Sequence, residues 1–409
     1  MLKKPREKLA LAFILVTVTL DTIGIGLIFP VLPQLIDRVT EGGIARAALW
    51  SGVLATSFAV MQFLCGPLMG GLSDRFGRRP VLLISTAIMA LDYLLLAVAN
   101  NIWLFLLARI ITGVTSATHS TALAYIADIT PEGGRAARFG LIGACFGVGF
   151  VLGPAVGGLL ANLSLQAPFY AAMALAGANF VFGYFVLPES LPAVERRPFD
   201  LTRANPLSAL NALARMPGLR SPLLVFLIMA IAMNVYATIW AYYGITAFGW
   251  SSGTVGLSLA IYGVSFAIGQ ALLVAPALRI LGEDRTVWLG MIFDIVSLVL
   301  LGVLTSGLAV LILIPFTALG GVVTPALQAI MSREVNANAQ GELQGVLASL
   351  NAIAMILSPL VMTWVFARFT TNPDQIFLPG APFLLAAALM TVAVILYLAR
   401  SKSRSARPA

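Results

Sequence analysis

The sequence predicts an all-α membrane protein with twelve transmembrane helices, arranged in two pseudo-symmetric halves of six. Three observations predict this fold. Of the 409 residues, 59% are hydrophobic and only 10% are charged, whereas soluble domains carry about 25% charged residues. Apolar runs of about 20 residues, the length that crosses a bilayer as a helix, occur twelve times along the chain. A weak internal repeat relates the two halves, as in many secondary transporters.

The predicted spans follow one another with short polar loops between most of them. They are residues 9–36, 47–72, 81–99, 102–126, 138–163, 168–188, 221–247, 252–281, 286–305, 307–331, 342–369 and 380–400. One long polar segment, 189–220, contains four prolines and five arginines and is predicted to be a linker. The predicted domains are therefore a half at 1–188, the linker 189–220, a half at 221–400 and a tail at 401–409. The basic start of the chain lacks a small-residue cleavage site, so we expect an uncleaved first span.

The positions of the basic residues predict the orientation. With both termini on one side, that side carries 21 of the 25 Lys and Arg residues, the opposite side carries three, and Arg109 lies within a span. Basic loops stay in the cytoplasm, so a multi-pass protein of the inner (plasma) membrane with both termini cytoplasmic is expected. The net charge of +8 comes without interleaved aromatic residues, which argues against nucleic acid as a partner. Cys65 and Cys145 fall within apolar runs, so no disulfide framework is implied.

The internal repeat is clearest in the fifth and eleventh spans. Residues 140–154 align without gaps on residues 345–359, an offset of 205, and small residues face small residues along the alignment. Upstream, Gln62-x4-Pro67 leading to Gly77-Arg78-Arg79 is echoed by Gln270-x5-Pro276 leading to 282–285. This second copy is shorter and carries fewer loop charges.

Four ionisable residues lie inside predicted spans, where a charge costs several kcal/mol and is a functional candidate by default. Asp21 and Asp92 lie about 18 Å from the cytoplasmic ends of their helices at about 1.5 Å per residue. Asp294 lies in the ninth span, and Arg109 enters the fourth span to the depth of Asp92. A carboxylate in a cavity of low dielectric constant can load a proton on one side and release it on the other. Proton coupling by these residues and a purely structural network both remain open, and for Arg109 a structural clamp is equally compatible.

The fifth span is dense in glycine. Gly147, Gly149, Gly153 and Pro154 would give a smooth, deformable helix face, or they would serve ordinary small-residue packing. Other polar and aromatic residues could line a cavity for an amphipathic, ring-bearing ligand. These are Gln62, His119, Asn234, Tyr236, Trp240, Phe266 and Gln270. His119, the single histidine of the chain, is equally compatible with a hydrogen-bonded core residue.

The stretch between the second and third spans concentrates charge in a few residues. Asp74, Arg75, Arg78 and Arg79 cannot lie in hydrocarbon, so a short loop at the membrane surface is expected at 73–80. Gly77 would turn the chain, and Pro80 suits the first turn of the next helix. We expect Asp74 to face the positive N-terminal end of the eleventh span near 340–341. The loop would then act as a latch rather than as part of a binding pocket.

Several motifs together resemble one transporter family. They are Leu20–Pro33 (LDTIGIGLIFPVLP), Ser73–Leu83 (SDRFGRRPVLL) with Gly70 before it, Ala124–Thr130 (AYIADIT), Arg109-x3-Gly113, Ala144–Gly149 (ACFGVG) and Thr324–Gln328 (TPALQ). This combination resembles the major facilitator superfamily and, within it, the tetracycline/proton antiporter branch. The resemblance covers the chain except the linker and tails.

The resemblance implies a role for each motif. It places Asp21, Asp92 and Asp294 in the transport path, and it implies that the fifth span carries a glycine-proline signature of antiporters. It makes Gly70, Asp74, Arg75, Gly77 and Arg78 parts of a cytoplasmic gate. One departure concerns a histidine that the branch often carries in the eighth span for proton coupling, because Phe266, or Ser265, stands there in this chain.

The sequence and the resemblance together predict a secondary transporter that exports an amphipathic, drug-like compound in exchange for protons. Its expected partners are the small-molecule substrate, protons and the lipid bilayer, with a monomer as the expected state. No metal or cofactor is predicted, and no Gly-x4-Gly-Lys-Ser/Thr motif for ATP occurs. Two alternatives remain: a proton-coupled or passive importer of a small solute such as a sugar, and a membrane-embedded enzyme or sensor. The second lacks a catalytic or metal-binding cluster, so the protein is not expected to be an enzyme.

Overall fold

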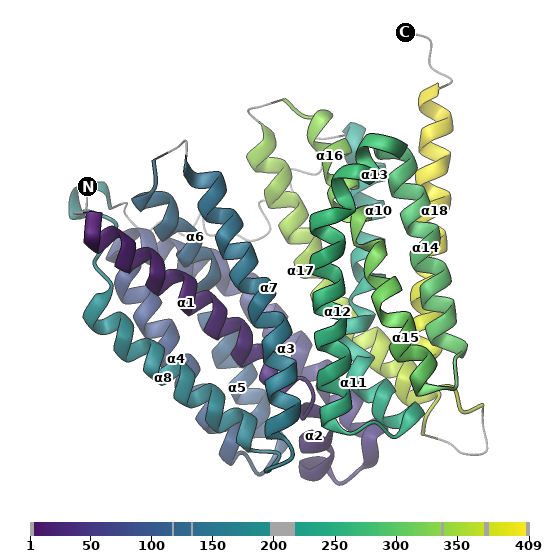
Figure 1. The fold of residues 1–409 in the computed structure, drawn as a ribbon, viewed down its shortest axis with the longest axis horizontal. Coiled ribbons are helices and arrows are strands. Elements are labelled where there is room, and N and C mark those ends of the chain that lie inside the picture. Colours follow the sequence, from purple (N-terminus) through teal and green to yellow (C-terminus); the bar gives the residue numbers. More distant parts are fainter. Residues whose placement is uncertain are drawn as a thin grey trace. The chain divides into compact units, whose positions relative to one another are not determined.

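The computed structural model describes residues 4–116, 118–131, 134–196, 217–336, 339–371 and 376–405, and every regular element in these residues is helical (Figure 1). Twelve segments of the described chain are long and apolar enough to cross a membrane, which confirms the predicted number of spans. The elements are α1 (Lys4–Ile28), α2 (Leu32–Thr40), α3 (Gly43–Phe76), α4 (Arg78–Val98), α5 (Ile102–Thr115), α6 (Thr118–Ile129), α7 (Arg135–Leu160), α8 (Ala167–Val186), the 3₁₀ helices η2 (Ala193–Glu195) and η3 (Pro217–Leu219), α10 (Arg220–Met233), α11 (Val235–Phe248), α12 (Ser252–Leu272), α13 (Val274–Leu281), α14 (Glu283–Val303), α15 (Gly307–Thr317), the 3₁₀ helix η4 (Ala318–Val322), α16 (Val323–Arg333), α17 (Gln340–Arg368) and α18 (Ala381–Ser405).

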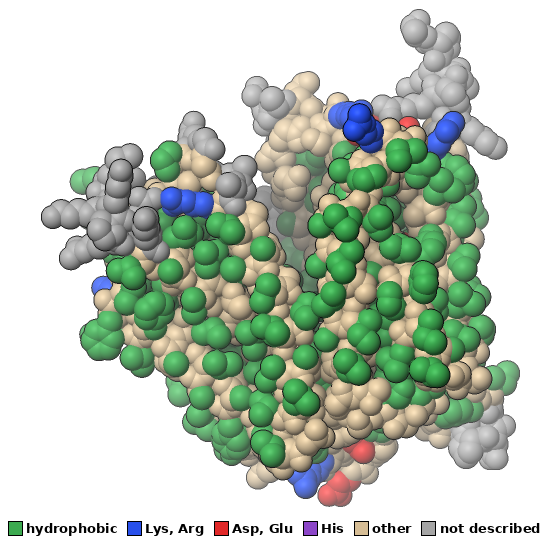
Figure 2. Space-filling model, in the orientation of Figure 1, with side chains coloured by type: hydrophobic (Ala, Val, Ile, Leu, Met, Phe, Trp, Pro, Cys, Tyr) green, Lys and Arg blue, Asp and Glu red, His purple; other side chains and the backbone are tan. Residues whose placement is uncertain are grey.

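The outer helix faces are apolar. Large hydrophobic side chains such as Trp103 and Phe185 are 66% and 79% exposed. On the face drawn in Figure 2, hydrophobic side chains cover the helices along their length, and the coloured Lys, Arg, Asp and Glu side chains lie at helix ends. Such continuous apolar surface would drive aggregation in water, but it is favourable against lipid chains.

The chain forms two compact units. The first comprises Met1–Glu41, Ser57–Pro206 and Ser252–Ala260, and the second comprises Gly42–Thr56, Leu207–Ser251 and Ile261–Ala409. The starts of α3 and α12 therefore each join helices from the other part of the sequence. The sequence-based division into halves at the linker stays a prediction.

Helix α1 organises the first unit, where it packs along α7 and α8, while α4 packs along α8, α5 and α6. The core between α1, α6 and α7 contains Phe13, Ile14, Tyr125 and Ile142, each at most 1% exposed. This packing places the middle of α1 next to the glycine-rich helix α7.

In the second unit, α14 packs along α18 and α16, and α10 packs along α18 and α17. Figure 1 shows α14 and α18 side by side. Aromatic rings fill the core near the end of α11, where the Tyr243 and Phe383 rings lie 4.9 Å apart. The Tyr243 hydroxyl donates to the Leu301 carbonyl oxygen at 2.6 Å, so its polar tip is satisfied inside an apolar core.

The first span is shorter than predicted. It ends at Ile28 rather than at residue 36, and 32–40 form the separate helix α2. Pro30 has no N–H to continue the helical hydrogen bonds, and the Val31 N–H bonds to the Ile28 carbonyl at 3.1 Å in a tight turn instead. Pro33 then occupies the first turn of α2, where a missing donor is tolerated. The prolines therefore end the span instead of bending it.

The predicted loop at 73–80 is also wrong in extent. Helix α3 continues through Phe76 and α4 starts at Arg78, so Gly77 alone separates the two helices. Its φ of 106° lies where only glycine is comfortable. The predicted eighth span, 252–281, is also interrupted near its end. Helix α12 ends at Leu272, and α13 is a separate helix.

The repeat extends well beyond the aligned fifth and eleventh spans. Helices α4 and α14 both have 21 residues, and their starts are 205 positions apart, at 78 and 283. The same offset relates the starts of α5 and α15, α6 and α16, and α7 and α17. Even the caps correspond, because the side chains of Asn101 and Ser306 each accept a backbone N–H three residues ahead. The two units therefore share one backbone plan over three consecutive spans.

Glycines set the crossing of α1 and α7. A Cβ atom built on Gly153 would lie 2.7 Å from the Cα of Gly26 and 2.8 Å from the Ile23 carbonyl oxygen. A Cβ on Gly149 would lie 2.8 Å from the Thr19 carbonyl oxygen. By contrast, a Cβ on Gly147 would meet no atom within 4 Å. Close packing therefore accounts for Gly149 and Gly153, whereas Gly147 has a free face.

We expect Gly153→Ala to destabilise the protein by about 1–3 kcal/mol, because the added methyl group overpacks the α1–α7 crossing. Gly147→Ala is the matched control on the same helix and should be neutral, or stabilising by up to about 1 kcal/mol through helix propensity. Thermal unfolding of the purified variants measures both effects. Equal midpoints for the two variants would contradict the close-packing account.

Candidate functional site

A buried ion pair joins α4 and α5 in the first unit. The Arg109 guanidinium donates to Asp92 Oδ2 at 3.1 Å, and the Asp92 side chain is completely buried. The other carboxylate oxygen, Oδ1, is buried with no hydrogen-bond partner in the described part of the chain. The matching depths of Asp92 and Arg109 in their spans suggested that the two residues could meet, and the structure brings them together. Their roles stay a prediction.

Asp21 lies on α1 in the same unit and is half-buried. Tyr93 directly follows Asp92, is 4% exposed and reaches α1. Its hydroxyl rests against Gly24, one turn beyond Asp21, where a Cβ would collide with the ring. Tyr93 is therefore a further candidate for the site, which the charges alone do not reveal.

Asp294 lies on α14 in the second unit and is 3% exposed. Its carboxylate packs against the backbone of Gly320 in η4, at the interruption between α15 and α16. Within the described residues, no ion pair with Asp294 is found. A carboxylate removed from water without a compensating cation is costly when charged, which makes Asp294 a candidate for proton binding.

An aromatic column stands beside Asp294. The rings of Tyr236 and Tyr262 stack at 6.0 Å, and those of Tyr262 and Phe266 stack at 5.9 Å. The Phe266 ring and the Asp294 carboxylate lie against neighbouring residues of η4, because a Cβ on Gly321 would collide with the ring and a Cβ on Gly320 with the carboxylate. Tyr262 was missed in the sequence, although it precedes Phe266 by one helical turn.

The other predicted cavity residues of the second unit surround this column. Trp240 lies 6.1 Å from the Tyr236 ring, and the Gln270 amide donates to the Gly321 carbonyl at 2.9 Å. Asn234 sits between α10 and α11, where its amide donates to the Ala230 carbonyl at 2.9 Å.

Two cavity candidates belong to the first unit. Gln62 belongs to the first unit, on α3, and is half-buried. His119 belongs to α6, but its side chain is outside the described part of the chain. A common cavity for all the candidates stays a prediction.

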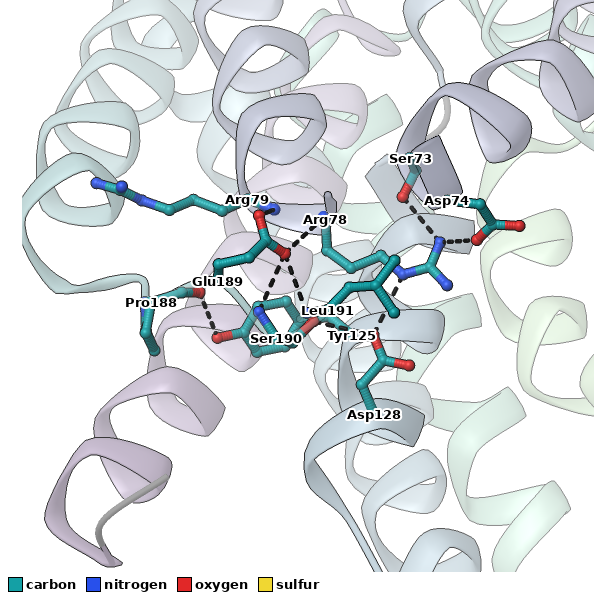
Figure 3. Close-up of polar contacts among 10 residues, drawn as sticks. All are labelled: Ser73, Asp74, Arg78, Arg79, Tyr125, Asp128, Pro188, Glu189, Ser190 and Leu191. Atoms are coloured by element: carbon teal, nitrogen blue, oxygen red, sulfur yellow. Dashed lines mark hydrogen bonds and ion pairs between the residues drawn. The ribbon is translucent and has the colours of Figure 1, made fainter. Parts of the chain in front are cut away.

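Figure 3 shows the polar network at the start of α4, in the first unit. Arg78 pairs with Asp74 at 2.5 Å and with Asp128 on α6 at 3.2 Å, and it donates to the Ser73 hydroxyl at 2.9 Å. Arg75 is exposed and lies 5.2 Å over the Phe76 ring. The expected partner of Asp74 near 340–341 belongs to the second unit, and that contact stays a prediction.

Glycines of the predicted gate differ in their surroundings. A Cβ on Gly70 would meet no atom within 4 Å, so close packing does not explain this residue. Gly77 needs its positive φ, and a Cβ there would also collide with the Glu189 carboxylate. Of the predicted gate residues, Gly77 is thus required by the local backbone, and the role of the gate stays a prediction.

Glu189 is the main functional candidate that the sequence did not reveal. It follows α8 in the chain, and its carboxylate accepts the backbone N–H groups of Arg78 at 2.8 Å and Arg79 at 3.3 Å (Figure 3). Ser190 donates its hydroxyl to Asp128 at 2.9 Å. These partners are 62 to 111 residues away in the chain, so no local pattern could indicate them.

Comparisons with known proteins fit this architecture. The sequence profile of the Major Facilitator Superfamily matches residues 14–359 and 222–409. The chain is 43% identical over 384 residues to the Tetracycline resistance protein, class C, of Escherichia coli, covering 94% of this chain and 95% of that protein. It is 41% identical to the class G protein of Vibrio anguillarum, covering 86% and 89% of the two chains.

Solved structures share the fold at lower identity. The human organic anion transporter MFSD10 matches with a TM-score of 0.68 and 24% identity, over 96% of this chain and 99% of that one. A bacterial homologue of the human lysosomal transporter Spinster, in an inward-facing and unoccupied conformation, matches with a TM-score of 0.79 and 14% identity, over 98% of both chains. Profile, relatives and fold agree, and the chain belongs to the Major Facilitator Superfamily of membrane transporters.

Proposed function

We propose that the protein is a secondary active transporter that exports a tetracycline-like, amphipathic compound in exchange for protons by alternating access. The observation that carries this proposal is Asp294, a buried carboxylate without an ion-pair partner among the described residues, beside a column of stacked rings. Relatives named for tetracycline resistance, at about 40% identity over most of the chain, support the same substrate class.

The buried carboxylates supply the proton coupling. A carboxylate that alternately faces the two sides of the membrane drives substrate export only if proton release is tied to the substrate step, since an untied carboxylate would merely leak protons down their gradient. The gradient supplies about 1.4 kcal/mol per pH unit and about 2.3 kcal/mol per charge for each 100 mV. In this scheme Asp294 binds the transported proton, Asp21 and Asp92 share the path through the first unit, and Arg109 holds Asp92 in place.

The aromatic column supplies the substrate contact. Rings at stacking distance from one another offer a face on which a planar, fused-ring molecule can stack, a contact that contributes about 0.5–1.5 kcal/mol beyond area burial. The Gln270 and Asn234 amides could then bond the polar edge of such a molecule.

The remaining features follow from the charge distribution and the fold. We place both termini in the cytoplasm, because that side carries 21 of the 25 basic residues. The protein would lie in the inner membrane and act as a monomer, with 189–220 as a cytoplasmic linker between the halves. Import of a sugar-like solute is the less favoured alternative, since tetracycline resistance proteins are similar over most of the chain.

Transport in proteoliposomes with tetracycline as the probe tests the exchange. Tetracycline added outside vesicles at equal pH should alkalinise the lumen in an antiporter, whereas a symporter would acidify it. We expect Asp294→Asn to lower this coupled flux at least about tenfold, equivalent to about 1.4 kcal/mol. The matched control is Glu342→Gln, which neutralises an exposed carboxylate at the start of α17 and should transport normally. Normal coupling in Asp294→Asn would refute the proton site.

Arg109→Gln should lower the stability by about 3–5 kcal/mol, because it leaves the Asp92 carboxylate buried without its cation. The double variant Asp92→Asn with Arg109→Gln should regain most of this loss. Thermal unfolding measures the stability, and the proteoliposome assay shows whether the stable double variant still couples. An unchanged midpoint in Arg109→Gln would show that the pair contributes nothing to the fold.

Phe266→Leu keeps an apolar side chain but removes the end ring of the column. We expect KM for tetracycline to rise about two- to tenfold with the maximal rate retained, since about 0.5–1.5 kcal/mol of stacking is lost. Phe316→Leu is the control, because Phe316 is exposed on the outer face of α15. Identical KM values for both variants would remove the column from the substrate site.

A further inference from the structure

The two units build the same helix junction with charges of opposite sign. Arg78 and Glu283 are the first residues of α4 and α14, and they are related by the 205-residue offset. Their partners at the ends of α6 and α16, Asp128 and Arg333, are related by the same offset. Arg78 lies 3.2 Å from Asp128, and Glu283 lies 2.6 Å from Arg333. One ion pair therefore occurs twice with its polarity reversed.

This reversal changes how the charges meet the helix dipoles. Negative charge is favourable at the N-terminus of a helix, and positive charge is favourable at its C-terminus. In the second unit, Glu283 lies in the first turn of α14 and Arg333 in the last turn of α16, so both charges are at favourable ends. In the first unit, Arg78 lies at the start of α4 and Asp128 near the end of α6, so both are at unfavourable ends.

The first unit obtains its missing anion from another segment. Glu189 places its carboxylate at the start of α4, where it accepts the N–H groups of Arg78 and Arg79 (Figure 3). The same carboxylate accepts the N–H groups of Ser190 and Leu191, both at 3.1 Å. Glu189 follows the end of α8 and belongs to no helix, at the point where the predicted linker begins.

We propose that Glu189 is a detachable anion that positions the start of α4, and through it Arg78, during one part of the transport cycle. This proposal rests on the proposed transport function. Glu189 can leave α4 without breaking a helical hydrogen bond, because it belongs to no helix. The backbone of Glu283 cannot move away from α14 in this manner, because it is the first residue of that helix. The junction of the first unit is thus releasable, and that of the second unit is fixed.

Glu189→Gln in the full-length protein tests the first half of this inference. It removes the anion from a helix start that carries two cations, so hydrogen exchange in the first turn of α4 should become roughly three- to thirtyfold faster. Maximal tetracycline transport in proteoliposomes should fall about tenfold, with an unchanged KM. Unchanged exchange would overturn the inference that Glu189 holds α4.

A permanent anion tests whether release matters. Pro80 is exposed in the first turn of α4, and Pro80→Glu places a carboxylate there that cannot leave. Combined with Glu189→Gln, it should restore slow exchange in α4 but not the transport rate. A purely structural cap would recover both, and that result would overturn the proposal.

Two controls complete the design. The side chain introduced by Pro80→Gln has the shape of the one introduced by Pro80→Glu but carries no charge, so Pro80→Gln should transport at nearly the wild-type rate. Equal slowing by the two variants would overturn the role of the anion. If Pro80→Glu fails to restore slow exchange in Glu189→Gln, then a helix-end anion is not what Glu189 supplies, and the proposal is also overturned. If wild type and Pro80→Gln both exchange tetracycline for protons, the proposed function holds. The outcomes above then test the role of Glu189 alone.

Discussion

The cost of charge in hydrocarbon constrains where the ionisable side chains of the described spans lie. On the face drawn in Figure 2, charged residues gather at the helix ends, while inside the spans Asp92 and Asp294 are each 3% exposed and Asp21 is half-buried. Asp92 meets this cost with the Arg109 guanidinium. Asp294 has no such partner among the described residues and lies against the Gly320 backbone instead. The same constraint thus produces one neutralised pair and one buried carboxylate without a cation among the described residues, and this asymmetry is the basis of the proposed proton site.

The repeat shows that backbone plan and charge pattern are separable. Three consecutive spans keep one offset of 205 residues between their helix starts, with equivalent caps at Asn101 and Ser306. At the helix junction, by contrast, Arg78 and Asp128 are exchanged in sign for Glu283 and Arg333. The shorter second copy has therefore not simply lost its charges, as the sequence comparison suggested, but uses an inverted pair. Coulomb attraction is indifferent to this exchange, whereas the helix dipoles are not.

Local signals in the sequence predicted the number of spans and the positions of the buried charges. Twelve spans could be counted because the length of an apolar run can be read from each segment by itself. The rise per residue of a helix then placed Asp92 at the same depth as Arg109. The boundaries at Pro30 and Gly77 were less accessible, because a proline can either bend or end a helix and a single glycine can replace a loop. Contacts between distant segments, such as Glu189 with the start of α4 or Tyr262 with Tyr236, depend on packing and leave no local pattern.

The backbone divides the motif glycines into those that close packing requires and those that it does not. Gly149 and Gly153 are explained by the close approach of α1 and α7, so their presence would be required in a protein of any function with this crossing. Gly70 has open space at its Cβ position, and packing within its unit does not require it. Gly147 shares this open space, so the Cβ positions distinguish the motif glycines that the fold requires from those that it does not, and they assign no role to the second group.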